Sequence, residues 1–389
     1  MSVIDWIQRA RRRTAALVRP RVPPGAAPAA FQPPPITDSV LAWCQANGQP
    51  DVLRLLPGFS VSRPPARTSD PEPHRKFQVP LSYQVPEKYL AVVQGVRLAG
   101  PAGLVVLPDG SFAAESIFER GHVERSPVYR APLPAQAARK PGRYYSLVIE
   151  YALDGNYYHW IHDAVLRLHL ILPHLPPDVQ FIVPPKLKRY QLDTLALLGI
   201  SADRLVPYDG SELWELETLY FSPPNFYSFV DSPAANAWFR DLALEKYGAV
   251  QKPRRRIYVS RRHALHHRLV NEPEVQQFLE RQGFETVALE TLTFPEQVRR
   301  FAEADVVIGG QGAGFTNVLF ASKGLVLIDI IEDSVITRCF WTLCAVMGQH
   351  YWYLLGDTVP IPNWYGDIYI TPKKIELALD RALGERGSA

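Results

Sequence analysis

Short apolar segments alternate with amphipathic ones from residue 254 to residue 355, and this alternation limits the possible folds more than any other feature of the sequence. The apolar segments are RRIYVSR, FETVAL, DVVIGG, GLVLIDII and YWYLL. Two of the segments between them begin with the Asn-x-x-Glu and Thr-x-x-Glu pairs that cap helices. A strand that is apolar on both faces must be covered on both faces, so the pattern predicts a parallel sheet between two layers of helices.

A less regular alternation precedes this region. YYSLVIEY, VQFIVP and RLVPY are predicted strands, and helices are expected over residues 157–172, in YQLDTLALLGI and near residues 234–247. Residues 85–134 contain short apolar runs broken by Gly, Pro and Asp-Gly, which favours β-structure with a hairpin at PDG. The 389 residues are therefore expected to form two α/β domains, joined near residues 249–256.

Charge and cysteine content exclude several classes of protein. The formal net charge of +3 is too small to indicate a nucleic-acid-binding protein. Three cysteines without CxxC spacing favour a reducing compartment, so we expect a cytoplasmic protein. No apolar run reaches about 18 residues and no apolar stretch precedes a cleavage site, so neither a transmembrane helix nor a signal peptide is expected.

Polar segments follow three predicted strands of the second domain. Arg261 and Arg262 follow the first strand, GGQGAGFTN follows the third, and Asp329 ends the fourth. The carboxyl ends of parallel strands meet at one edge of a sheet, where ligands bind. A Gly-rich turn before a helix offers backbone N–H groups, arginines offer bidentate phosphate donors, and a carboxylate can bind ribose hydroxyls. Each feature alone can reflect packing or solvation, but together they predict a nucleotide diphosphate site.

Four motifs that occur in order resemble the family 61 glycosyltransferases. They are NYYHWIHDAVLRL, RRIYVSRRHALHHRLVNEPEV, GFETVALETLTFPEQVRRFAEADVVIGGQGAGFTNVLF and LIDI, all within residues 151–355. The family includes capsular polysaccharide enzymes of bacteria and plant and animal enzymes that add pentoses or N-acetylglucosamine. The chain departs from the family pattern at Gln311, where His is usual, and at Asp329, where Glu is frequent.

The resemblance implies a GT-B-like fold, in which two Rossmann-like domains have parallel sheets that face each other across a cleft. The chain would then consist of a basic, Pro-rich arm over residues 1–75, an acceptor-side α/β domain over residues 76–250 and a nucleotide-sugar donor domain over residues 251–357. The remaining segment, residues 358–389, ends in a helix that could cross back to the first domain.

The resemblance also implies an activity. The reaction would be inverting, metal-independent transfer of a hexosyl, pentosyl or other glycosyl group from a nucleotide sugar to a saccharide or lipid-linked saccharide acceptor, in bacterial surface polysaccharide synthesis such as capsule formation. No cofactor and no metal ion would be required. The expected donor-binding residues are Arg261, Arg262, Gln311, Gly312, Ala313, Gly314, Asn317 and Asp329.

An inverting transferase needs a base for the acceptor hydroxyl, and the segment GNYYHWIHDA offers candidates. On a helix that begins near Tyr157, the side chains of His159, His162 and Asp163 are three and four residues apart and share one face. We expect Asp163 to be the base, oriented by His159 or His162, or one of these histidines to be the base itself.

Two other functions would use the same residues. His159, His162 and Asp163 could be metal ligands of a metal-dependent hydrolase. Alternatively, the chain could be a non-catalytic nucleotide-sugar-binding protein that retains the donor fold. Turnover of a nucleotide sugar in the presence of a chelator distinguishes these alternatives from a metal-independent transferase.

The first 22 residues combine a short apolar stretch with a strongly basic one. Val3, Ile4, Trp6 and Ile7 are followed by six arginines between Arg9 and Arg21. As a helix, this segment could lie on the anionic inner face of a membrane, which would make the protein peripheral. A solvated basic tail, or a helix packed on the second domain, is the alternative.

Overall fold

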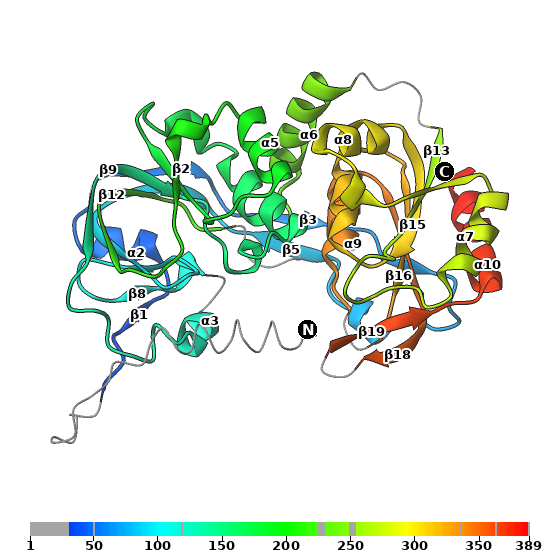
Figure 1. Cartoon of the computed structure of the whole chain (residues 1–389), viewed down its shortest axis with the longest axis horizontal. Helices are drawn as coiled ribbons and strands as arrows, with labels where there is room; N and C mark the ends of the chain where they lie inside the picture. Colours follow the sequence, from blue (N-terminus) through cyan, green and yellow to red (C-terminus); the bar gives the residue numbers. More distant parts are fainter. Residues whose placement is uncertain are drawn as a thin grey trace.

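The computed structural model describes residues 31–49, 51–117, 120–224, 230–248, 254–333, 336–361 and 364–387. Figure 1 shows two lobes, each built around its own sheet, with the earlier part of the chain in one lobe and the later part in the other. The predicted membrane-binding segment, residues 1–22, lies outside the described residues. In the part of the chain that is described, no helix has the length and apolar content needed to span a bilayer.

The second lobe confirms the parallel sheet that its apolar strands predict. Within the described residues its sheet has six strands, and every pairing is parallel. In spatial order they are β14 (Phe284–Val287), β13 (Arg255–Val259), β15 (Ala304–Gly310), β16 (Val326–Ile331), β17 (His350–Leu355) and β4 (Arg67–Thr68).

Helices cover both faces of this sheet, which explains why its central strands are mainly apolar. On one face, Val306 and Ile308 of β15 belong to the same apolar cluster as Val275 and Ile375, which lie on α7 (Glu272–Arg281) and α10 (Pro372–Gly387). On the other face, Val307 belongs to the cluster that contains α8 (Phe294–Ala302), η9 (Ala313–Phe320) and α9 (Cys339–Val346). Successive side chains of a strand point to opposite faces, so a strand covered on both faces favours consecutive apolar residues.

The first lobe has a mixed sheet, and only half of it matches the expectation of a parallel one. Its described strands lie in the order β1 (Ile36–Thr37), β8 (Phe112–Ala113), β7 (Leu104–Val106), β6 (Lys88–Ala99), β12 (Trp214–Phe221), β9 (Ala138–Ser146), β10 (Gln180–Val183) and β11 (Leu205–Pro207), with β2 (Val52–Leu56) also paired to β6. The pairs from β12 through β9 and β10 to β11 are parallel, whereas β6 pairs antiparallel with β7 and β12.

Short turns join the antiparallel neighbours β6, β7 and β8. The predicted hairpin at PDG is confirmed between β7 and β8, where Gly110 has a φ of +88°. A turn this short can join only antiparallel strands, whereas parallel neighbours need a crossover connection. Each parallel neighbour pair from β12 to β11 is accordingly separated by a longer stretch that contains helical turns, such as α5 (Arg189–Leu197) between β10 and β11.

An apolar contact joins the two lobes. The ring of Phe239, on α6 (Pro233–Tyr247), lies 6.3 Å from that of Phe294 on α8 and 6.1 Å from that of Phe320 in η9. All three side chains are fully buried or nearly so. Because α6 follows the last strand of the first sheet, this contact fixes the end of the first lobe against the helical layer of the second.

The N-terminal arm and the C-terminal helix are arranged differently from the sequence-based expectation. Within residues 31–75, α2 (Val40–Ala46) is followed by strands that join both sheets, since β2 pairs with β6 and β4 pairs with β17. Helix α10 packs on the second sheet rather than crossing back to the first, because its apolar side chains, including Ile375, belong to the apolar cluster of that sheet. The domain boundaries predicted at residues 75, 250 and 357 remain predictions.

The remaining described elements are small. Two separate antiparallel pairs are β3 (Phe59–Ser62) with β5 (Ser82–Val85) and β18 (Asp357–Ile361) with β19 (Trp364–Tyr369). Helix α3 (Arg120–Arg125) and several short helical turns complete the first lobe.

Candidate active site

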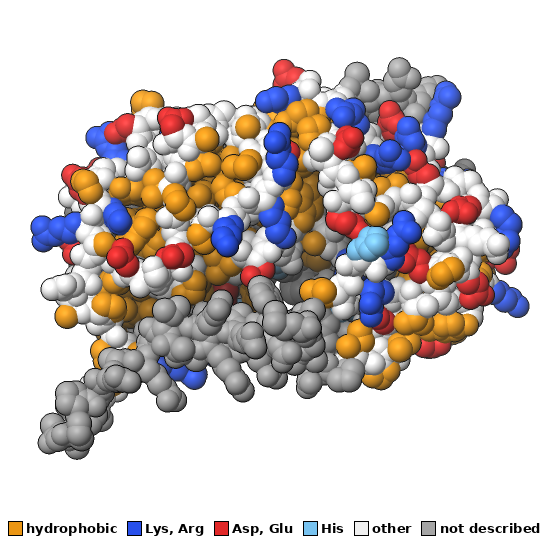
Figure 2. All heavy atoms as spheres, in the orientation of Figure 1, with side chains coloured by type: hydrophobic (Ala, Val, Ile, Leu, Met, Phe, Trp, Pro, Cys, Tyr) orange, Lys and Arg blue, Asp and Glu red, His pale blue; other side chains and the backbone are white. Residues whose placement is uncertain are grey.

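A cavity of about 620 Å³ lies between the two lobes. Figure 2 shows the surface hollowed between the lobes, with basic side chains beside the hollow. The second lobe supplies residues that follow its strands, among them Arg261, Gly312 and Gly314. The first lobe supplies Tyr157 and the segment 188–190. The carboxyl ends of strands from both sheets therefore meet at this cavity, as expected for ligand sites of α/β proteins.

Arg261 is held in a fixed position beside the Gly-rich turn. Its Nε donates to the carbonyl oxygen of His267 at 3.2 Å, and its Nη2 donates to that of His266 at 2.9 Å. Among the described residues, Nη1 has no hydrogen-bond acceptor, and the side chain lines the cavity. Burial lowers the pKa of Arg261 to about 10, so the guanidinium remains charged at neutral pH. Arg261 thus presents a pre-oriented cationic donor to the cavity.

The glycines of the turn make room for this arginine. A Cβ atom added at Gly312 would overlap Nη1 of Arg261, and one added at Gly310 would lie 2.8 Å from the carbonyl oxygen of His267. Gly314 faces Leu289, whose side chain would meet any added Cβ. The glycines are required because the backbone and the arginine approach each other closely, and the turn places backbone N–H groups beside the same cavity.

Three other predicted donor residues support this site from beneath. Gln311 is buried and donates from Nε2 to Oδ2 of Asp329 at 2.8 Å. Asp329 is fully buried and also accepts a hydrogen bond from the hydroxyl of Tyr351 at 3.0 Å. Asn317 is fully buried, and its Oδ1 accepts a hydrogen bond from the hydroxyl of Tyr157 at 2.7 Å, which links the lobes.

The last two predicted donor residues are not at the cavity wall. Arg262 is exposed, and neither it nor Ala313 lines the cavity. The structure therefore brings Arg261, Gly312 and Gly314 together at the cavity, whereas a direct contact between Asp329 and a ribose or sugar hydroxyl would require the buried carboxylate to be exposed. The reason is that β16 continues to Ile331, so Asp329 lies within the strand and not beyond its end.

Asp329 provides a test of this packing. Burial raises the pKa of Asp329 to about 7, which is well above the value expected in the unfolded chain. Its protonated form therefore favours folding below pH 4, and this contribution is lost as the pH rises through 7. Asp329→Asn is neutral at every pH. As the pH rises from 5 to 8, we expect its free energy of unfolding to increase relative to that of the wild type, by on the order of 2–4 kcal/mol.

Thermal unfolding at several pH values measures this difference. Asp380→Asn is a matched control, since Asp380 is exposed on α10. A stability difference for Asp329→Asn that did not change between pH 5 and pH 8 would contradict the buried, protonated carboxyl group.

The segment GNYYHWIHDA folds as an irregular helix rather than the regular helix expected over residues 157–172. Asn156 caps a single turn, α4 (Tyr157–His159), by accepting hydrogen bonds from the backbone N–H groups of Tyr158 and His159. A π-helical turn, η4 (Trp160–Val165), and a 3₁₀ turn, η5 (Leu166–Leu168), follow. Such π turns are rare and occur frequently at functional sites.

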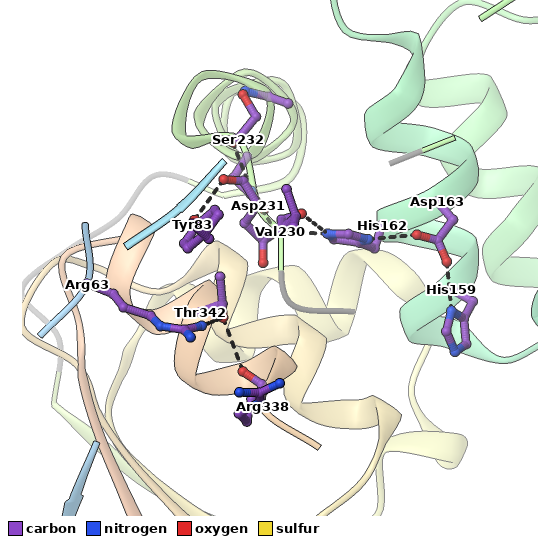
Figure 3. Close-up of polar contacts among 12 residues, drawn as sticks. Arg63, Tyr83, His159, His162, Asp163, Val230, Asp231, Ser232, Arg338 and Thr342 are labelled. Atoms are coloured by element: carbon purple, nitrogen blue, oxygen red, sulfur yellow. Dashed lines mark hydrogen bonds and ion pairs between the residues drawn. The ribbon is translucent and has the colours of Figure 1, made fainter. Parts of the chain in front are cut away.

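The three predicted catalytic residues meet in this turn. Asp163 is buried, and its Oδ2 lies 2.7 Å from Nδ1 of His159 while its Oδ1 lies 2.8 Å from Nδ1 of His162. His162 in turn has its Nε2 3.1 Å from Oδ1 of Asp231, a residue just before α6. Figure 3 shows His162 between the two aspartates and His159 at the far end of the chain of contacts.

Protonation states follow from these contacts. Burial alone would lower the pKa of His162, but Asp231 and Asp163 together raise it to about 10. Burial alone would raise the pKa of Asp163, but hydrogen bonds from His159 and His162 hold it below its usual value. At neutral pH, His162 is therefore an imidazolium whose Nδ1–H faces Asp163 and whose Nε2–H faces Asp231 and the carbonyl oxygen of Val230, and Asp163 is ionised.

The arrangement favours His159 as the base and Asp163 as the residue that positions it. The side chain of His159 is 17% exposed, whereas that of Asp163 is 1% exposed and both of its oxygens face histidines. When neutral His159 donates its Nδ1–H to Asp163, the lone pair of the ring is on Nε2, directed away from the carboxylate. Tyr157, two residues earlier, lines the cavity, whereas His159, His162 and Asp163 are not among its lining residues. The helix therefore connects the histidine–aspartate pair to the cavity through Tyr157.

The two histidines use their Nδ1 atoms for Asp163, and Nε2 of His162 lies near Asp231. Within the described ranges, no group of three or more His, Cys, Asp or Glu side chains is arranged to hold a metal ion.

Sequence reasoning missed several residues of this site. Lys188, Arg189 and Tyr190 line the cavity and follow the carboxyl end of β10. The rule that ligands bind beyond the carboxyl ends of parallel strands could have identified them if it had been applied to the first lobe as well. Asp231 does not belong to a recognisable sequence motif, and it lies near His162 only in the folded structure.

Comparisons with known proteins agree with the resemblance seen in the sequence. Residues 157–328 match the family model described as Glycosyltransferase 61. The chain is also similar to the beta-1,2-xylosyltransferase XYXT1 of Oryza sativa subsp. japonica, with 26% identity over 199 residues. That alignment covers 46% of this chain and 42% of the rice protein, so the chain spans less than half the length of this relative.

The family model supports a relation to glycosyltransferase family 61, and the rice relative supports glycosyltransferase activity. The region matched by the family model contains His159, Asp163, Arg261 and Gly312, so it includes both the histidine–aspartate pair and the cavity. Neither comparison distinguishes a bacterial capsular enzyme from its plant relatives.

Proposed function

We propose that this chain transfers a glycosyl group from a nucleotide sugar to a hydroxyl group of a saccharide or lipid-linked saccharide acceptor, with inversion at the anomeric carbon. The observation that carries the proposal is the cavity between the lobes, where Arg261 is fixed against a Gly-rich turn and the helix of the His159–Asp163 pair contributes Tyr157. The match to the family model over residues 157–328 supports the same activity.

The donor would bind with its diphosphate against the second lobe. Nη1 of Arg261 and the backbone N–H groups near Gly312 and Gly314 provide positive potential, and a helical segment, η9, begins directly after them. Gln311 and Asp329 stabilise the turn from below through their mutual hydrogen bond. Asn317 fixes the turn to the first lobe through Tyr157.

The reaction would be a single displacement. The acceptor oxygen bonds to the anomeric carbon on one face, while the bond between that carbon and the phosphate oxygen breaks on the opposite face. The acceptor proton passes to Nε2 of His159, and Asp163 stabilises the resulting imidazolium. The developing charge on the nucleoside diphosphate is met by Arg261 and the turn N–H groups.

Activity is expected to survive EDTA. In the proposed site, the guanidinium and the backbone N–H groups take the role that a divalent cation has in metal-dependent transferases. The measurement is the initial rate of nucleoside diphosphate release before and after dialysis against EDTA. A loss of activity that one divalent ion restores would contradict this mechanism and favour a metal-dependent one.

The proposed activity also suggests a biological setting. We place the enzyme in bacterial surface polysaccharide synthesis, in the cytoplasm or peripherally on the inner face of the membrane, because nucleotide sugars and lipid-linked acceptors meet there. Sedimentation with liposomes of graded anionic content, with and without residues 1–22, tests the membrane part of this proposal.

A screen of nucleotide sugars by thermal shift tests the activity itself. A ligand of the folded protein at one hundred times its dissociation constant stabilises it by about 2.7 kcal/mol, which is easily measured. We expect at least one nucleotide sugar and its nucleoside diphosphate to raise the unfolding temperature. If a broad panel gave no shift and no turnover, the proposed function would be wrong.

A further inference from the structure

The cavity wall opposite Arg261 is also basic. We infer that Lys188 and Arg189 of the first lobe complete the diphosphate site, so that cationic groups from both lobes hold the ligand; this inference rests on the proposed function. Neither the motifs of the sequence nor the comparisons assign a role to these two residues.

The first observation is the excess of positive charge among the residues that line the cavity. Among the described residues around the cavity, Lys188, Arg189 and Arg261 are cationic, and Glu290 is the one carboxylate. Such an imbalance in a concave site between two lobes favours an anionic ligand with more than one charge. The cationic side chains come from both lobes, with Lys188 and Arg189 at the start of α5 and Arg261 beyond β13.

The position of Lys188 is determined by the backbone. Its Nζ donates to the carbonyl oxygen of Gly155 at 3.2 Å, and the hydroxyl of Tyr190 donates to the same oxygen at 2.8 Å. Gly155 has a φ of +72°, and an added Cβ would lie 2.7 Å from Nζ, so the lysine side chain lies against a residue that has no side chain. An ammonium group has three N–H donors, and this contact uses one of them.

Both residues are exposed, and Arg189 is held by an ion pair on its own helix. Its Nε donates to Oδ1 of Asp193 at 2.8 Å, while the side chain as a whole is 82% exposed. That ion pair turns the guanidinium along α5 and partly neutralises it, but Arg189 still lines the cavity. We therefore expect Arg189 to contribute less to ligand binding than Lys188.

Chemistry gives the reason for a second cationic wall. A nucleoside diphosphate gains negative charge as it leaves, and in the proposed metal-free site that charge is met by protein groups alone. Lys188 also contacts Gly155, which directly precedes Asn156, the cap of α4. The ligand-binding lysine and the helix that contains His159 thus share one backbone segment.

Isothermal titration calorimetry with UDP, GDP and ADP, and with the matching monophosphates and nucleosides, tests the inference. For the nucleoside diphosphate that the wild type binds, we expect Lys188→Gln to weaken binding about tenfold or more at low salt. Lys188→Gln combined with Arg189→Gln should weaken it further and reduce its salt dependence, while nucleoside binding stays unchanged. Lys188→Arg should retain most of the affinity, because it keeps the charge.

Lys186→Gln is the matched control, since Lys186 is exposed two residues earlier and does not line the cavity. If the wild type binds a nucleoside diphosphate and the Lys188→Gln, Arg189→Gln double variant binds it within twofold of the wild type, the inference is wrong and the proposed function stands. An equal loss in Lys186→Gln would also overturn it, because a general charge effect would then explain the result. If the wild type binds none of the diphosphates and no nucleotide sugar, the proposed function itself fails.

Discussion

The His159→Gln variant is expected to bind the nucleotide sugar normally and to lose at least a hundredfold in turnover. Glutamine can still donate a hydrogen bond to Asp163, but it cannot accept the acceptor proton. General bases contribute about 10² to 10⁴ in rate, which sets the expected loss. Single-turnover measurement of nucleoside diphosphate release, together with donor titration, separates the chemical step from binding.

Asp163→Asn should change the kinetics differently, because Asp163 positions His159 and balances the positive charge of His162. An amide has one oxygen to accept hydrogen bonds from two histidines, whereas the carboxylate has two. We expect a loss in turnover together with an altered dependence of the rate on pH, since the charge next to both rings disappears. His174→Gln, on an exposed turn of the same lobe, serves as the control and should have wild-type activity. Near-normal turnover in His159→Gln would remove His159 from the reaction.

Gly312→Ala is expected to impair donor binding as strongly as Arg261→Ala. Removal of the arginine deletes a hydrogen bond between charged groups, which is worth about 1.5–3 kcal/mol, or roughly 10- to 150-fold in affinity for a nucleoside diphosphate. The methyl group at residue 312 would overlap Nη1 of Arg261, so it should displace the guanidinium and produce a similar loss. Binding of the nucleoside alone should hardly change in either variant.

A variant with both Gly312→Ala and Arg261→Ala measures the energetic coupling between the two residues. If Gly312→Ala acts through Arg261, its effect should largely disappear once Arg261 is already alanine. Gly384→Ala is the matched control, since Gly384 lies in α10 with no atom within 4 Å of an added Cβ and no positive φ. Equal losses for nucleoside and nucleoside diphosphate would show that neither residue acts on the phosphates.

The second sheet could be predicted from the sequence, and the reasons are local. Each strand from β13 to β17 is a short apolar run between capped or amphipathic helices, and only a parallel sheet covered on both faces buries such runs. The mixed first sheet was only partly predicted. Its antiparallel half depends on which hairpin pairs with which parallel strand, and β6 pairs with β12 across more than one hundred residues of sequence.

The candidate site, too, could be predicted only in part. The meeting of His159, His162 and Asp163 followed from their spacing, although the π turn that holds them could not be read from the sequence. The role of Asp329 depended on where β16 ends, and two further paired residues place it in the interior. Asp231 and Lys188 reach the site through tertiary structure alone, because their sequence neighbours give no periodic or compositional signal.

The most direct test of the central claim is a crystal structure of the full chain with the nucleoside diphosphate that the thermal-shift screen identifies. We predict that the diphosphate lies in the cavity between the lobes, with a phosphate oxygen within hydrogen-bond distance of Nη1 of Arg261 and of a backbone N–H in the segment 312–314. The anomeric carbon of a bound nucleotide sugar should then face the helix that contains His159. A nucleotide bound elsewhere on the chain, or one in the cavity with its phosphates remote from Arg261, would contradict the account.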